Sequence, residues 1–204
     1  PVSARHTADA SKEPYRMENL INRTLDDFSV QAFCRGEFRV IDRDNLKGHW
    51  SVLFFYPADF TFVCPTELED LTEQYEKFKN IGCEIYSVST DSHFAHKAWA
   101  DASETIRAVP FPMLSDATGV LARSLGVYME DVGQALRGTF VMDPEGRIKV
   151  YEVHDTGIGR NAEELLRKVE AAQFVAEHGD QVCPAKWRPG AQTLKPSIDL
   201  VGNI

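Results

Sequence analysis

The segment SVLFFY at residues 51–56, a continuous apolar run after its first residue Ser51, constrains the fold more than any other feature of the chain. A strand that is apolar at consecutive positions is typical of a sheet covered by helices on both faces. Residues 66–78 then show the periodicity of an amphipathic helix, whose apolar face consists of Leu68, Leu71, Tyr75 and Phe78. A buried strand followed directly by such a helix indicates an α/β protein.

Strand and helix patterns alternate along the rest of the chain. Further strands are expected at 82–90, at 111–114, and as a hairpin at 137–143 and 147–154 around the turn 144–146. Further helices are expected at 92–103, 118–126 and 161–179; the last begins at a capping Asn161, with Glu164 three residues on, and stops at Gly179. The pattern predicts an α/β fold with a central mixed sheet flanked by helices.

The chain divides into three segments by composition. Residues 1–16 are polar and aperiodic and precede Met17, so we expect a flexible leader or a cloning remnant there. Residues 17–182 are expected to form one domain, because 43% hydrophobic residues in a chain of 204 suffice for one real core. Residues 183–204 are Pro-rich and are expected to form an irregular C-terminal tail.

Charge and cysteine usage exclude several classes of protein. A net charge of −9 is unsuited to binding a nucleic-acid backbone. The chain has no run of 18 apolar residues and no apolar signal segment, so neither a membrane span nor secretion is expected. No two of its four cysteines lie within three residues of each other, which excludes C-x-x-C zinc and redox pairs. We therefore expect a reduced, cytoplasmic protein.

Cys64, in the segment FTFVCPTE, is placed where a cysteine can react. Pro65 suits the first turn of a helix, which predicts that Cys64 lies at or beside the N-cap. Unpaired backbone N–H groups at that position favour a negatively charged sulfur, and the thiolate is the nucleophilic form of cysteine. Thr61 could donate a hydrogen bond to the sulfur or to an oxygen bound there. The local pattern leaves a second interpretation open, a buried thiol that only packs.

A longer comparison favours the reactive interpretation. The segment PADFTFVCPTE resembles the active-site segment of the peroxiredoxins, in which Pro, Thr and Cys have the spacing of Pro57, Thr61 and Cys64. YSVSTDSHFAHKAW, RGTFVMDPEG, GIGRNAEELLRKVEAAQ and VCPAKW also resemble peroxiredoxin segments. With the ending DLVGNI, they are most similar to the alkyl hydroperoxide reductase branch of that family. The resemblance extends over residues 17–204.

This resemblance implies a thioredoxin-like fold of the peroxiredoxin type and a thiol peroxidase that needs no metal or bound cofactor. It implies that Cys64 attacks the peroxide, that Pro57 shields the sulfur from water, and that Thr61 hydrogen-bonds the incoming oxygen. Arg137 would stabilise the thiolate and orient the peroxide. Cys183, supplied by the partner chain of a dimer, would resolve the Cys64 sulfenic acid as an intersubunit disulfide, after the start of the 66–78 helix unwinds.

The resemblance also implies substrates and partners. The substrates would be hydrogen peroxide, organic hydroperoxides and peroxynitrite; the chain would form homodimers and a decamer of five dimers. A flavin-dependent disulfide reductase or thioredoxin would reduce the disulfide. A holdase chaperone or redox relay is the non-enzymatic alternative. A general disulfide oxidoreductase of the thioredoxin type would need a second cysteine in Cys64-Pro65-Thr66-Glu67.

Other motifs carry weaker signals. Cys34 and Cys83 match no catalytic position and are expected to pack in the interior. GIGRNA (157–162) fits a dinucleotide fingerprint, but no strand is expected after the next helix, so a tight turn is the preferred interpretation. His93 and His96 lack a third ligand and are interpreted as a surface pair.

The chain departs from peroxiredoxins that overoxidise readily. Those members carry a Gly-Gly-Leu-Gly loop and a terminal Tyr-Phe, whereas this chain has MEDVGQAL at 129–136 and ends in LVGNI. A less anchored tail would let Cys183 reach Cys64 sooner. We therefore expect an enzyme that resists overoxidation.

Overall fold

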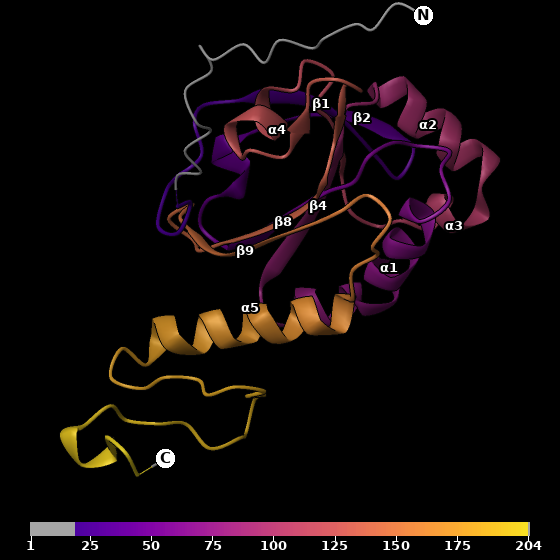
Figure 1. Cartoon of the computed structure of the whole chain (residues 1–204). Coiled ribbons are helices and arrows are strands. Elements are labelled where there is room, and N and C mark those ends of the chain that lie inside the picture. The colour runs from indigo at the N-terminus through magenta and orange to yellow at the C-terminus, as the bar shows by residue number, and fades with distance from the viewer. Residues whose placement is uncertain (1–18, 204) are drawn as a thin grey trace, which may run out of the picture.

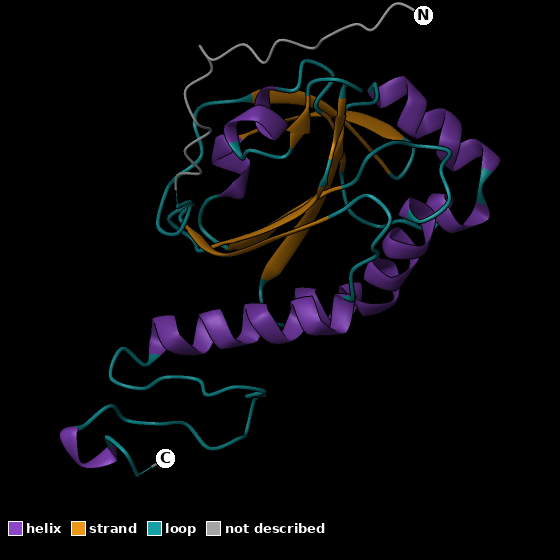
Figure 2. Ribbon diagram, in the orientation of Figure 1, coloured by secondary structure: helices purple, strands orange, loops and turns teal. Residues whose placement is uncertain are grey.

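The computed structural model describes residues 19–203. The leader predicted at 1–16 lies outside the described residues and stays a prediction. Figures 1 and 2 show one central sheet with helices on both sides, and a C-terminal tail that extends beyond the last helix. Among the described residues, no helix is both long enough and apolar enough to cross a membrane.

The central sheet has seven strands in the order β2-β1-β5-β4-β3-β8-β9. They are β1 (Ser29–Cys34), β2 (Glu37–Asp42), β3 (Trp50–Phe55), β4 (Cys83–Ser89), β5 (Met113–Ser115), β8 (Arg137–Met142) and β9 (Ile148–His154). β4 pairs in parallel with β3 and β5, whereas the other pairings are antiparallel, so the sheet is mixed as predicted. β6 (Tyr128–Met129) and β7 (Gln134–Ala135) form a separate small hairpin.

The predicted apolar strand is β3, and its place in the sheet explains its composition. It lies between β4 and β8. Because neighbouring side chains of a strand point to opposite faces, Val52 and Phe54 join one hydrophobic cluster, whereas Leu53 and Phe55 join the other. Both faces of β3 are therefore covered, which is why none of its central positions is polar.

Helices cover the sheet unequally. They are α1 (Cys64–Asn80), α2 (His93–Ala102), α3 (Glu104–Arg107), α4 (Val120–Ser124) and α5 (Ala162–Glu177), with short 3-10 turns η1 (Arg43–Leu46) and η2 (Ile198–Leu200). Apolar residues of α1, α2, α3 and α5 join the cluster on one face, whereas α4 contributes to the other. Asn161 caps α5 by accepting a hydrogen bond from the Glu164 N–H, as predicted.

The tail after α5 is irregular, as predicted, but it is held at several points. Val182 pairs with Leu194 in an isolated bridge. Trp187 is buried, with its ring 4.9 Å from that of Phe174 on α5, and its carbonyl accepts a hydrogen bond from Arg167. In Figure 1 most of the tail lies on the side of α5 away from the sheet.

Candidate active site

Cys64 is the first residue of α1, directly after the loop that follows β3. The helix begins two residues earlier than the pattern indicated, because Val63 already has helical dihedral angles and its carbonyl accepts from the N–H groups of Thr66 and Glu67. Pro65 occupies the first turn, where its missing N–H costs no hydrogen bond. The predicted position of Cys64 at the helix N-terminus is therefore confirmed, and its side chain is completely buried.

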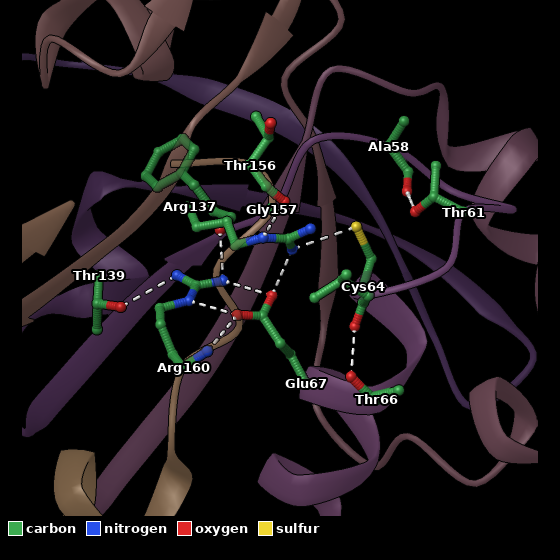
Figure 3. A network of polar contacts seen from close by, with 12 residues as sticks. Ala58, Thr61, Cys64, Thr66, Glu67, Arg137, Thr139, Thr156, Gly157 and Arg160 are labelled. Atoms are coloured by element: carbon green, nitrogen blue, oxygen red, sulfur yellow. Dashed lines mark hydrogen bonds and ion pairs between the residues drawn. The ribbon is translucent and has the colours of Figure 1, made fainter. Parts of the chain in front are cut away.

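Arg137, the first residue of β8, contacts the sulfur. Its Nη1 lies 3.4 Å from Sγ of Cys64 and 2.7 Å from Oε2 of Glu67, and its Nε donates to the Thr156 carbonyl at 2.8 Å. Figure 3 shows the guanidinium between the sulfur and the Glu67 carboxylate. The side chain is only 3% exposed, so water screens its charge little. In general, a fixed cation beside a cysteine sulfur favours the negatively charged form of that sulfur.

A second buried arginine holds Glu67 from the other side. The Glu67 carboxylate accepts from Nε, Nη2 and the backbone N–H of Arg160 at 2.8, 3.0 and 2.8 Å. Burial alone would raise the pKa of Glu67, but the hydrogen bonds and charge of Arg160, with the charge of Arg137, hold this pKa below its ordinary value. Glu67 is therefore an anion fixed between two cations, one of which contacts the sulfur.

Arg160 also connects its own loop, the glycine-containing segment 157–162, to the sheet. It donates to the carbonyls of Gly138 and Phe55 and to the Thr139 hydroxyl, and it lies over the Phe54 ring. This loop is the GIGRNA segment, and no strand follows α5 among the described residues that would complete a dinucleotide fold. The segment thus delivers an arginine to the site.

The sequence patterns pointed to neither Glu67 nor Arg160 as a site residue. Glu67 had one signal, because it lies three residues after Cys64 and so shares its helix face. Arg160 had none, because an arginine in a glycine-rich loop is ordinarily solvated.

Pro57 and Thr61 lie in the loop that leads to Cys64. Pro57 is buried and Thr61 is half-buried. The Thr61 hydroxyl donates to the Ala58 carbonyl at 2.8 Å, and in the view of Figure 3 the sulfur lies between Thr61 and Arg137. The structure thus brings Thr61, Cys64 and Arg137 to one region, although the Thr61 hydroxyl is bonded to its own loop.

Cys183 is not part of this region. Its thiol contacts the Ala171 carbonyl on α5, and all four cysteines are free. Partial burial raises the pKa of the Cys183 thiol above its ordinary value, although the charge of Arg167 opposes this. Because Cys64 is fully buried, its sulfur can bond to Cys183 only after the residues around it move.

The remaining cysteines and histidines have simpler environments. Cys34 and Cys83 are buried, as predicted, and burial raises the pKa of each thiol. The interpretation of His93 and His96 as a surface pair is wrong, because His96 is completely buried and bonded to Asp59. Within residues 19–203, no group of three or more His, Cys, Asp or Glu side chains could hold a metal ion.

Models of two known families match most of the chain. The model of the AhpC/TSA family matches residues 21–151, and that of the C-terminal domain of 1-Cys peroxiredoxin matches residues 171–203. The chain belongs to the AhpC/TSA family. It is a peroxiredoxin, an enzyme that reduces peroxides with a cysteine thiol.

Relatives at high identity cover nearly the whole peroxiredoxin. Alkyl hydroperoxide reductase C of Salmonella typhimurium is 54% identical over 186 residues, which are 91% of this chain and 100% of the relative. The protein of the same name from Bacillus subtilis is 51% identical over the same shares. The crystal structure of Enterococcus faecalis AhpC matches with a TM-score of 0.80 at 58% identity, covering 82% of this chain and all of that one. Reduced Plasmodium vivax 2-Cys peroxiredoxin matches with a TM-score of 0.85 at 29% identity, covering 89% and 96%.

Proposed function

We propose that this peroxiredoxin reduces hydrogen peroxide and organic hydroperoxides with Cys64 as the reacting thiol. The observation that carries the proposal is the contact of 3.4 Å between Nη1 of Arg137 and Sγ of Cys64 at the start of α1. A buried cation and a helix N-terminus both favour the thiolate, which is the form that attacks a peroxide.

In the first step the Cys64 thiolate attacks one peroxide oxygen and the O–O bond breaks. The sulfur gains an S–O bond and becomes a sulfenic acid, while the departing alkoxide or hydroxide takes a proton from solvent and leaves as alcohol or water. Arg137 stabilises the charge that moves onto the departing oxygen. Pro57 keeps bulk water from the sulfur, and Thr61 turns its hydroxyl toward the peroxide.

In the second step the Cys183 thiol of a partner chain attacks the Cys64 sulfenic acid. The new S–S bond replaces the S–OH bond, and the hydroxyl leaves as water. The burial of Cys64 and the contact of Cys183 with Ala171 support a mechanism in which α1 unwinds at its start and the tail leaves α5. Opening one helix turn and a tail is a local unfolding, which costs far less than global unfolding.

The assembly and partners follow from the same proposal. The enzyme acts as a homodimer, and five dimers associate into a decamer. A flavin-dependent disulfide reductase or thioredoxin in the cytoplasm returns the disulfide to two thiols. Residues 17–182 form the catalytic domain, and residues 183–204 form the tail that carries the resolving cysteine. Nothing in residues 19–203 favours a holdase chaperone or redox relay over the peroxidase.

Peroxide consumption tests the function. Purified protein with dithiothreitol as reductant should consume hydrogen peroxide and cumene hydroperoxide catalytically, whereas Cys64→Ser should not exceed the rate of dithiothreitol alone. Reconstitution with each of the two reductase systems identifies the reductant. Activity retained in Cys64→Ser would show that another group reacts with the peroxide.

A further inference from the structure

Asp59, in the loop between β3 and Cys64, is held by a buried polar network. Its Oδ1 accepts from the Tyr56 hydroxyl at 2.8 Å, and its Oδ2 lies 2.8 Å from Nδ1 of His96 on α2. Its backbone N–H donates to Asp91, just beyond β4, at 2.9 Å. Tyr56 and His96 are completely buried, and Asp59 is nearly so. This network therefore ties the active-site loop to the end of β3, to α2 and to the segment after β4.

Every polar side-chain atom of Tyr56, Asp59 and His96 has a hydrogen-bond partner. Nε2 of His96 faces the Leu114 carbonyl at 3.2 Å, so both ring nitrogens face acceptors. Burial, and then the charge of Asp59, raise the pKa of Tyr56 well above its ordinary value, which keeps its hydroxyl a donor.

The network restrains a strained residue. Phe60, next to Asp59, has φ of +56°, in the left-handed region that a bulky side chain rarely adopts. Its ring is more than half exposed and contacts Trp99 at a centroid distance of 5.9 Å, so packing of its own ring covers it only in part. A strained backbone persists only where its surroundings hold it, and the adjacent restraints are the bonds of Asp59 on one side and the Thr61–Ala58 bond on the other.

We propose that Tyr56, Asp59 and His96 are positioning residues that form a latch on the active-site loop. The latch holds the loop that leads to Cys64, and its opening, helped by release of the strain at Phe60, controls how fast Cys64 reaches Cys183. This inference rests on the proposed function, because it concerns the second step of that reaction. The latch contacts neither Cys64 nor Arg137 through the hydrogen bonds described, so the first step depends on it less.

Matched variants separate the latch from general stability. Tyr56→Phe removes one buried hydroxyl from the latch. Tyr86→Phe is the control. The hydroxyl that it removes donates to the Asn45 carbonyl, and Tyr86 packs in the hydrophobic cluster on the opposite face of the sheet from Tyr56 and Cys64. Asp59→Ala removes both acceptors of the latch. Asp59→Asn keeps the latch intact, because its amide oxygen can accept from Tyr56 and its amide nitrogen can donate to Nδ1 of His96.

The two steps are measured separately in rapid-quench experiments on the reduced full-length protein. Hydrogen peroxide is added, free thiols are alkylated at each time point, and mass spectrometry counts thiol, sulfenic acid, sulfinic acid and Cys64–Cys183 disulfide. Tyr56→Phe should form the disulfide about fivefold faster than wild type, the factor for one net hydrogen bond. Asp59→Ala should be faster still and yield less sulfinic acid at high peroxide. In both variants, the rate at which peroxide oxidises the Cys64 thiol should stay within twofold of the wild-type rate.

The controls decide between the possible outcomes. Asp59→Asn and Tyr86→Phe should form the disulfide at the wild-type rate, although Tyr86→Phe lowers the melting temperature. Wild-type disulfide rates in both Tyr56→Phe and Asp59→Ala would overturn the latch, as would an equal acceleration in Tyr86→Phe. If instead wild-type Cys64 were not oxidised by peroxide, the proposed function itself would fail.

Discussion

Replacing Glu67 with glutamine removes the anion between two buried guanidinium groups. The carboxylate accepts four hydrogen bonds at 2.7 to 3.0 Å, one from Arg137 and three from Arg160, and its side chain is 2% exposed. A glutamine has one oxygen for these donors, and its NH₂ group would face an N–H. The two buried cations would then lose the carboxylate that they share. Loss of one partner of a buried pair costs about 3–5 kcal/mol, and low exposure leaves little screening.

Urea unfolding of the reduced protein at pH 7 measures this cost. We expect Glu67→Gln to lose about 3–5 kcal/mol of unfolding free energy. Glu164→Gln is the matched control, because Glu164 forms a similar ion pair with Arg167 but is 43% exposed. Loss of that exposed pair should lower the unfolding free energy by less than about 1 kcal/mol. Glu67→Gln should also react with peroxide more slowly, because Arg137 loses the carboxylate that helps to fix its position. A loss in Glu67→Gln no larger than in Glu164→Gln would refute the reasoning.

Three further predictions concern charge, pH and oxidation. Arg137→Lys keeps the charge but not the fork that reaches Thr156, Glu67 and Cys64 together, so stopped-flow oxidation of Cys64 should slow about 10- to 100-fold; a change under threefold would contradict this role. The folded-state pKa of Glu67 is lowered, so its ionised carboxylate stabilises the folded protein above the unfolded pKa of about 4.3. That stabilisation is lost as the pH falls through the folded-state pKa. In urea titrations, the difference in unfolding free energy between wild type and Glu67→Gln should therefore shrink as the pH drops below about 4. After several turnovers at micromolar peroxide, mass spectrometry should find Cys64 mostly free of sulfinic acid, and a largely sulfinic Cys64 would show that resistance to overoxidation was wrongly expected.

Local patterns predicted the features of the fold that local physics determines. The apolar composition of β3 indicated that both of its faces are covered. The Asn161 cap of α5 and the position of Cys64 at the N-terminus of α1 depend only on residues close by in the sequence, so local patterns indicated them too. The exact start of α1 was missed because Pro65 is compatible with either the first or the second helical position.

Contacts between distant segments could not be predicted in this way. Cys64 and Arg137 are 73 residues apart, and only the resemblance to peroxiredoxins connected them before the structure did. Glu67 and Arg160 are 93 residues apart, and no periodicity marks a buried ion pair. His96 was misplaced on the surface because its partner Asp59 lies outside its own helix, and a histidine is buried at low cost only when both ring nitrogens are satisfied.

The central claim is that the Cys64 thiolate meets peroxide and Cys183 of a second chain resolves the product. A non-reducing gel after addition of one equivalent of hydrogen peroxide tests it most directly, with wild type, Cys64→Ser and Cys183→Ser side by side. Wild type should shift to a disulfide-linked dimer that dithiothreitol reverses, and neither variant should do so alone. An equal yield of dimer from Cys64→Ser would contradict the account.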